Sequence, residues 1–139
     1  MKKTITVKVS FEERKNFLIR VPLLPGCVAA FIKNNEMNIN EIAEKMVEEY
    51  LKDLRKNKIE IPEEFNGEYV LEYVYTTEAY LNYFDRFLPK SSFALLTGIN
   101  ENQLWYYSSG LRQPRKDQKE RIISGMNNLE KALERSTII

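Results

Sequence analysis

Apolar and polar residues alternate strictly near the start of the chain, a pattern typical of a strand with one buried face. Over residues 4–11 the apolar positions are Ile5, Val7, Val9 and Phe11. A charged turn separates this segment from a second predicted strand over residues 17–21, and a third short apolar run occupies residues 27–32. The pattern therefore predicts a hairpin that is extended by a third strand.

The spacing of apolar residues changes from two to three or four after Asn38, which indicates a helix over residues 39–54. Asn38 is a favoured N-cap residue, and Glu41 stands in the capping-box position three residues later. The apolar stripe consists of Ile39, Ile42, Ala43, Met46, Val47, Tyr50, Leu51 and Leu54. Residues 69–75 are aromatic and β-branched, which predicts a fourth strand. We expect an α+β domain over residues 1–76 in the order β-β-β-α-β, with the helix stripe packed on the sheet.

Residues 77–139 are predicted to form a second, all-helical domain, joined to the first through residues 63–80. Its first helix is expected to carry Tyr80, Leu81, Phe84, Phe87 and Leu88, with Pro89 ending the pattern. A last helix can begin at Pro114, and its apolar stripe is Ile122, Ile123, Met126, Leu129 and Leu133. Gly125 interrupts this stripe, at an expected cost of roughly 1 kcal/mol relative to alanine.

Between these helices, residues 90–114 are typical of a helix-turn-helix that lies in the DNA major groove. Gly98 suits a turn with positive φ, Ala94 is small where two helices would cross, and Leu104 and Tyr107 recur on the inner face. The outward face is rich in amides, which can read adenine edges. The predicted base-reading residues are Asn100, Glu101, Asn102, Gln103 and Tyr106, and the predicted phosphate-binding residues are Lys90, Ser91, Arg112 and Arg115. The alternative interpretation is an αα-hairpin in some other helical domain, because apolar residues around a glycine are common.

Composition changes this picture little, but the charge distribution adds to it. The 139 residues have a formal net charge of +1, with 43% hydrophobic and 12% aromatic residues, as expected for a globular protein. Residues 1–78 hold 12 lysines and arginines against 14 acidic residues, whereas residues 79–139 hold 9 against 6. The positive half is thus the one that holds the predicted DNA-reading helix. No apolar run approaches the roughly 20 residues of a membrane span.

The residue types present in the sequence do not favour an enzyme. Histidine is absent and Cys27 is the single cysteine, so an internal disulfide is excluded and a zinc site is not expected. The three aspartates, Asp53, Asp85 and Asp117, fall in predicted helices and not on strands, where a two-metal nuclease would need them. We therefore expect no enzyme, no cofactor and no metal, and we interpret Cys27 as a small packing residue in a reducing cytoplasm.

For three features of the sequence, two interpretations remain open. Tyr69, Tyr73 and Tyr75 could stack bases, but no basic residue lies between Glu68 and Arg86, so core packing or a protein interface is favoured. The basic stretch of Arg112, Arg115, Lys116, Lys119 and Arg121 suits either phosphate contact or a solvated helix surface. Trp105 could be buried against the last helix or exposed at a dimer or DNA surface.

The order of these parts resembles the HicB family of antitoxins with a C-terminal helix-turn-helix. The residues that carry the resemblance are Val21-Pro22-Leu23-Leu24-Pro25-Gly26-Cys27, the helix start Asn38-Ile39-Asn40-Glu41-Ile42, and the helix exit Tyr50-Leu51 with Ile61-Pro62-Glu63. The resemblance covers about residues 3–64. Leu23 stands where the family has aspartate, and residues 28–38 lack the family's glycine-aspartate-threonine approach to the helix. Thr97 is polar where a helix-turn-helix usually has an aliphatic residue.

The resemblance implies a catalytically degenerate, partial ribonuclease H-like domain that binds and neutralises a small HicA-type mRNA-cleaving toxin. It also implies that the helix-turn-helix represses the operon by binding double-stranded operator DNA. We expect a cytoplasmic homodimer or higher homo-oligomer, since two-fold operators need two reading helices roughly 34 Å apart. The competing hypotheses are a stand-alone transcription regulator whose N-terminal domain binds a ligand or another protein, and an interaction module that has lost DNA binding.

Overall fold

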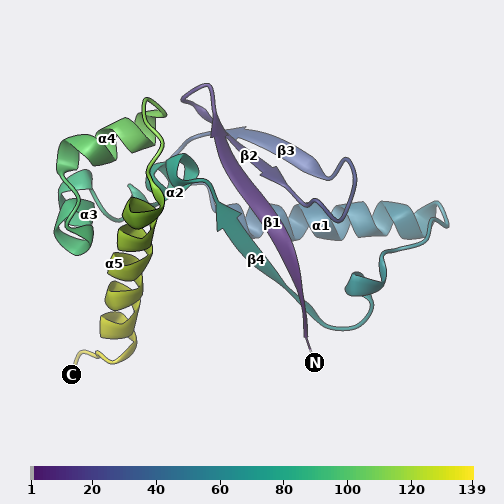
Figure 1. Ribbon diagram of the computed structural model, residues 1–139. Helices are drawn as coiled ribbons and strands as arrows, with labels where there is room; N and C mark the ends of the chain where they lie inside the picture. Colours follow the sequence, from purple (N-terminus) through teal and green to yellow (C-terminus); the bar gives the residue numbers. More distant parts are fainter. Residues whose placement is uncertain (1) are drawn as a thin grey trace. The chain divides into compact units, whose positions relative to one another are not determined.

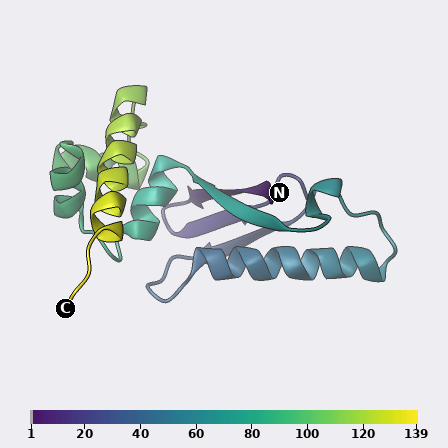
Figure 2. The same cartoon turned by 90° about the horizontal axis from the view of Figure 1, so that it is seen from below.

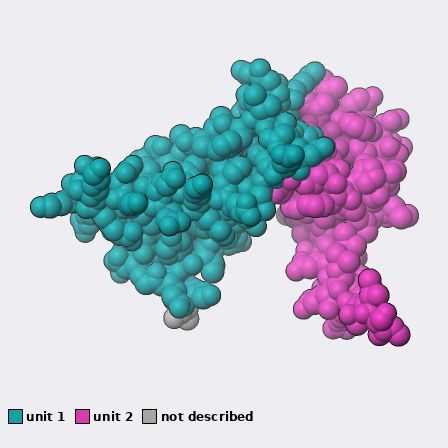
Figure 3. Space-filling view, turned by 180° about the vertical axis from the view of Figure 1, so that it is seen from behind, with its two compact units in different colours: residues 1–76 teal, residues 77–139 magenta. Residues whose placement is uncertain are grey.

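A computed structural model describes residues 2–139 (Figure 1). The chain folds as two compact units, residues 1–76 and residues 77–139, which are coloured separately in Figure 3. Together the described residues form a four-stranded mixed sheet and five α-helices, so the protein is α+β. None of these helices combines the length and the apolar character that crossing a membrane requires.

The first unit is built on a sheet with the strand order β3-β2-β1-β4. Its strands are β1 (Lys3–Glu12), β2 (Asn16–Arg20), β3 (Val28–Ile32) and β4 (Tyr69–Tyr75). The first three pair antiparallel as a meander, whereas β4 pairs parallel with β1 in the register Lys3↔Tyr69 to Val9↔Tyr75. All four strands were predicted from the sequence, the first from its alternation of apolar and polar residues, and the structure confirms them.

One face of the sheet is covered by α1 (Ile39–Lys56), which runs along it in Figure 2. Asn38 caps this helix as predicted, because its side-chain oxygen accepts a hydrogen bond of 3.1 Å from the Glu41 backbone N–H. The sheet contributes Ile5, Val7, Val9, Phe11, Phe17 and Ile19 to the core, and the helix contributes Ile39, Ala43, Val47 and Leu51. The other face of the sheet carries exposed apolar side chains, among them Ile32 and Val74.

The tyrosines of β4 are half-buried on the helix-covered face, where Tyr73 and Tyr75 are in register with the core residues Val7 and Val9 of β1. Tyr69 packs edge-on against Phe65, which lies in the short 3-10 helix η1 (Glu63–Phe65). The Tyr73 hydroxyl donates a hydrogen bond of 3.3 Å to the Asn40 carbonyl oxygen. These contacts favour core packing over base stacking. Because η1, β4 and the start of α2 occupy residues 63–80, this segment is not a free linker.

The second unit consists of α2 (Thr77–Phe84), α3 (Lys90–Thr97), α4 (Glu101–Ser109) and α5 (Lys116–Glu134). Its core is one cluster made of Leu81, Phe93, Ile99, Leu104, Tyr107 and Ile122. The inner-face residues Leu104 and Tyr107 were predicted to be buried, and they are.

The first helix of this unit is shorter than predicted. It ends at Phe84, so Asp85 lies outside it, and Phe87 is 68% exposed. The amides of Phe87 and Leu88 both donate to the Phe84 carbonyl oxygen, which closes the chain into a turn. Pro89 disfavours a helical conformation at Leu88, so the helix could not have continued through Leu88 as the apolar spacing predicted.

The apolar stripe of α5 also differs from the prediction. Ile122 is buried, but Ile123 and Leu133 are exposed at 58% and 66%. Gly125 is buried as well, and a Cβ atom there would lie 2.6 Å from the Leu96 carbonyl oxygen. The glycine therefore lets α5 approach the backbone of α3, and the expected advantage of alanine does not apply to this site.

Candidate nucleic-acid interface

A tight three-residue turn joins α3 to α4. Gly98 ends α3 in the left-handed conformation, with φ of 73°, and its amide donates a hydrogen bond of 2.9 Å to the Ala94 carbonyl oxygen. Ile99 is buried in the core cluster, and Asn100 begins α4. The left-handed residue and the buried anchor together fix the crossing of the two helices, as the sequence predicted for Gly98.

Thr97 fits its buried position through two hydrogen bonds. Its hydroxyl donates to the Phe93 carbonyl oxygen at 2.6 Å and accepts from the Ile99 amide at 3.2 Å. The polar groups of the Thr97 side chain therefore find their hydrogen-bond partners within the turn itself. Threonine can replace the usual aliphatic residue here without disrupting the turn.

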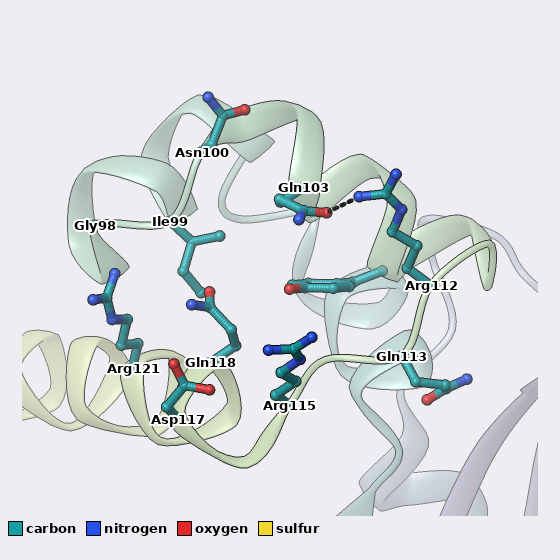
Figure 4. A pocket seen from close by; sticks show the side chains of 11 residues that line it. Gly98, Ile99, Asn100, Gln103, Arg112, Gln113, Arg115, Asp117, Gln118 and Arg121 are labelled. Carbon is teal, nitrogen blue, oxygen red and sulfur yellow. Dashed lines mark hydrogen bonds between the residues drawn. The ribbon is translucent and has the colours of Figure 1, made fainter.

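Asn100 caps α4. Its side-chain oxygen accepts a hydrogen bond of 2.8 Å from the Asn102 amide, and its carboxamide nitrogen points away from the neighbouring cavity (Figure 4). The sequence predicted that Asn100 reads bases. The structure shows that its oxygen caps the start of the helix.

The outward face of α4 is formed by Glu101, Asn102, Trp105 and Tyr106, which are all exposed. Positions i, i+1, i+4 and i+5 lie on one side of a helix, so the structure brings these four side chains together. We call them the reading face. Three of them were predicted as base-reading residues, whereas Trp105, at 55% exposure, was left undecided by the sequence.

Gln103, the remaining predicted base-reading residue, lies on a different side of α4. It is half-buried, and its side-chain oxygen accepts a long hydrogen bond of 3.5 Å from the Arg112 guanidinium. The same guanidinium lies 4.7 Å from the centroid of the Tyr106 ring, in cation–π contact. Arg112 therefore connects the reading face with the adjoining cavity.

That cavity, which we call the arginine pocket, has a volume of about 630 Å³ and lies between the α3–α4 turn, α4 and the start of α5. Its charged lining residues are Arg112, Arg115, Asp117 and Arg121, and Gln103 and Gln118 add amides (Figure 4). Three guanidinium groups against one carboxylate leave an excess of positive charge. Guanidinium groups with amides at their side suit an anionic oxygen ligand such as a phosphate group.

Arg115 and Arg112 were predicted phosphate ligands, and the pocket brings them together. Arg121 was considered only as part of the basic stretch with two interpretations, and Gln118 was not singled out by the sequence. The signal that could have found them is their spacing, since residues 115, 118 and 121 recur every three positions at the start of α5 and share one face. Lys116 and Lys119, from the same basic stretch, are exposed and do not line the pocket.

The two other predicted phosphate ligands have different surroundings. Ser91 is exposed at the start of α3. Lys90 is only 4% exposed, and its ammonium group lies 4.7 Å from the centroid of the Trp105 ring. The structure thus presents the Lys90 side chain to the indole and not to the surface, because burying its long alkyl stem favours packing.

Reactive side chains outside this unit form no comparable constellation. Cys27 is 3% exposed, and burial raises the pKa of its thiol, which disfavours the nucleophilic thiolate. Within residues 2–139 there is also no group of three or more carboxylate and thiol side chains placed to hold a metal ion. The reading face and the arginine pocket are therefore the candidate site.

No family model, curated protein or solved structure matches this chain. The resemblance to HicB antitoxins rests on the short motifs quoted above, and the function has to be argued from the geometry of the two units.

Proposed function

We propose that residues 77–139 bind double-stranded DNA as a helix-turn-helix and that the chain is a regulator of the antitoxin type. The observation that carries the proposal is the α3–turn–α4 geometry, in which a polar reading face lies beside a pocket with three arginines. In this proposal α4 is the recognition helix and enters the major groove.

The residue types of the reading face match the chemistry of base edges. The Asn102 carboxamide can donate to and accept from adenine in a bidentate pair, and the Glu101 carboxylate can accept from the amino group of cytosine. The arginine pocket supplies contacts to the backbone, which position the domain without reading sequence. Two copies of the chain are needed for a two-fold operator, so the proposal includes a homodimer.

For the first unit we propose a small protein partner, which the HicB resemblance identifies as a HicA-type toxin. The support is β3, a strand at the edge of the sheet whose five residues carry no charge. A cavity beside it is lined by Phe31, Met46 and Tyr50, and its charged lining residues are Glu49, Asp53 and Lys45, a net charge of −1. An edge strand with an apolar and acidic border suits the addition of a strand from a basic partner.

The proposed DNA binding is tested with the full chain and a duplex selected from a randomised pool. Asn102→Ala is expected to weaken binding to the selected duplex by about 1–3 kcal/mol and to leave binding to random DNA nearly unchanged. Asn128→Ala, an exposed asparagine on α5, is the matched control. An equal loss of affinity for both DNAs would show that Asn102 does not read bases. Failure to select any duplex would overturn the proposed DNA binding as a whole.

The proposed protein partner is tested by co-expression with the small protein encoded beside this chain, followed by affinity purification and a growth assay. A stoichiometric complex that relieves growth arrest supports the antitoxin. Ile32→Lys, on the edge strand β3, is expected to weaken the complex, whereas Val74→Lys, on the opposite edge strand, is the control. DNA binding without any complex would instead identify a stand-alone regulator.

A further inference from the structure

Trp105 is the only tryptophan in the chain, and the structure places it on the reading face with 55% of its surface exposed. It is not a loose surface residue, because the Lys90 ammonium group lies 4.7 Å from the ring centroid. Lys90 is itself 4% exposed, so a buried cation holds one face of an exposed indole. The arrangement fixes the ring while leaving apolar surface available to a ligand.

The position of Trp105 along α4 determines what that surface can meet. Trp105 lies one turn after Glu101, and helical side chains lean toward the N-terminus of their helix. The indole therefore covers the first turn of α4, beside Glu101 and Asn102. This turn is the part of a recognition helix that contacts base edges in the major groove.

We infer that Trp105 is a specificity-determining residue that contacts the C5-methyl group of a thymine. This inference rests on the proposed DNA binding. The major groove presents one apolar group, the thymine methyl, among hydrogen-bond donors and acceptors. On the reading face Glu101 and Asn102 supply hydrogen-bonding groups, and the indole supplies apolar surface. The ring and the methyl group are thus the matching apolar partners.

Replacing thymine with deoxyuridine tests the contact directly, because the change removes the methyl group and keeps every base-pairing group. In a duplex selected by the wild-type chain, one substitution in one half-site is expected to weaken binding about fourfold, the value of one buried methyl group. With Trp105→Ala the same substitution is expected to change binding by less than about 1.5-fold, since the apolar partner is already gone. Leu95→Ala, an 86% exposed apolar residue on α3, is the control and should keep the wild-type sensitivity.

A second measurement uses the wild-type chain and needs no variant to fold. When 5-iodouracil replaces the sensitive thymine, its iodine occupies the place of the methyl group. Irradiation breaks the C5–I bond, and C5 of the uracil then bonds to an adjacent aromatic side chain with loss of HI. The cross-linked peptide is expected to contain Trp105. A cross-link to Tyr106, or equal deoxyuridine sensitivity in wild type and Trp105→Ala, would overturn the inference while leaving DNA binding in place. Failure to select any duplex would overturn the proposed function as well.

Discussion

Gly125→Ala offers a direct test of how α5 packs on α3. The added methyl group would lie 2.6 Å from the Leu96 carbonyl oxygen, 3.0 Å from its carbonyl carbon and 3.2 Å from the Thr97 Cγ2. The first two atoms are backbone, so the clash cannot be relieved by rotating a side chain. Either α5 moves outward or α3 shifts, and overpacking of this kind typically costs about 1–3 kcal/mol.

Helix propensity acts in the opposite direction. Alanine is favoured over glycine by about 1 kcal/mol inside a helix, which is the gain expected if Gly125 were an ordinary helical position. Because the clash involves backbone on both helices, we place its cost at the upper end of the overpacking range. The variant should then be less stable than wild type by roughly 1–2 kcal/mol.

The assay is urea unfolding of the full chain followed by tryptophan fluorescence. Trp105 is the only tryptophan and lies in the second unit, so the signal reports on that unit. Ser124→Ala, at the exposed neighbouring position of the same helix, is the control and should gain a few tenths of a kcal/mol. If Gly125→Ala proved as stable as wild type or more so, the close approach of α5 to the Leu96 carbonyl would be refuted.

The remaining predictions concern the cap, the pocket and the thiol. Asn38→Ala should destabilise the first unit by about 1 kcal/mol in thermal unfolding followed by circular dichroism, because it removes the bond to the Glu41 amide; an unchanged midpoint would contradict this. Replacing Arg115 and Arg121 by alanine should lower the magnitude of the slope of log affinity against log salt concentration by about two, on specific and random DNA alike. The control is the double variant Lys131→Ala with Arg135→Ala, which removes the same charge elsewhere and should leave the slope unchanged. Cys27 should react with thiol reagents far more slowly in the native than in the unfolded chain. Since burial raises its pKa, the free energy of unfolding should fall as the pH rises past the ordinary cysteine range, and less so in Cys27→Ala.

The elements that could be predicted are those in which a local period decides the structure. The alternation at Ile5, Val7 and Val9 and the capped stripe that begins at Asn38 each fix an element without reference to the rest of the chain. Gly98 belongs with them, because the left-handed end of a helix is itself a local requirement.

The features that could not be predicted depend on which segments meet in space. Lys90 was predicted to bind a DNA phosphate, but packing against Trp105 buries it. Gly125 was expected to be an interruption, because the Leu96 carbonyl that requires it lies 29 positions earlier in the chain. Asn100 and Asn102 have the same exposed side chain, and only the geometry of the helix start makes one of them the cap of α4.

The parallel pairing of β4 with β1 has a consequence for how the protein is made. Strand β1 lies inside the sheet, and its partner on one side, residues 69–75, is synthesised more than 60 residues later. Until β4 leaves the ribosome, β1 is an edge strand that carries Ile5, Val7 and Val9. Nascent chains from which residues 69–75 have not yet emerged should therefore be prone to aggregation and depend on chaperones, and the sheet should close only while the second unit is being translated.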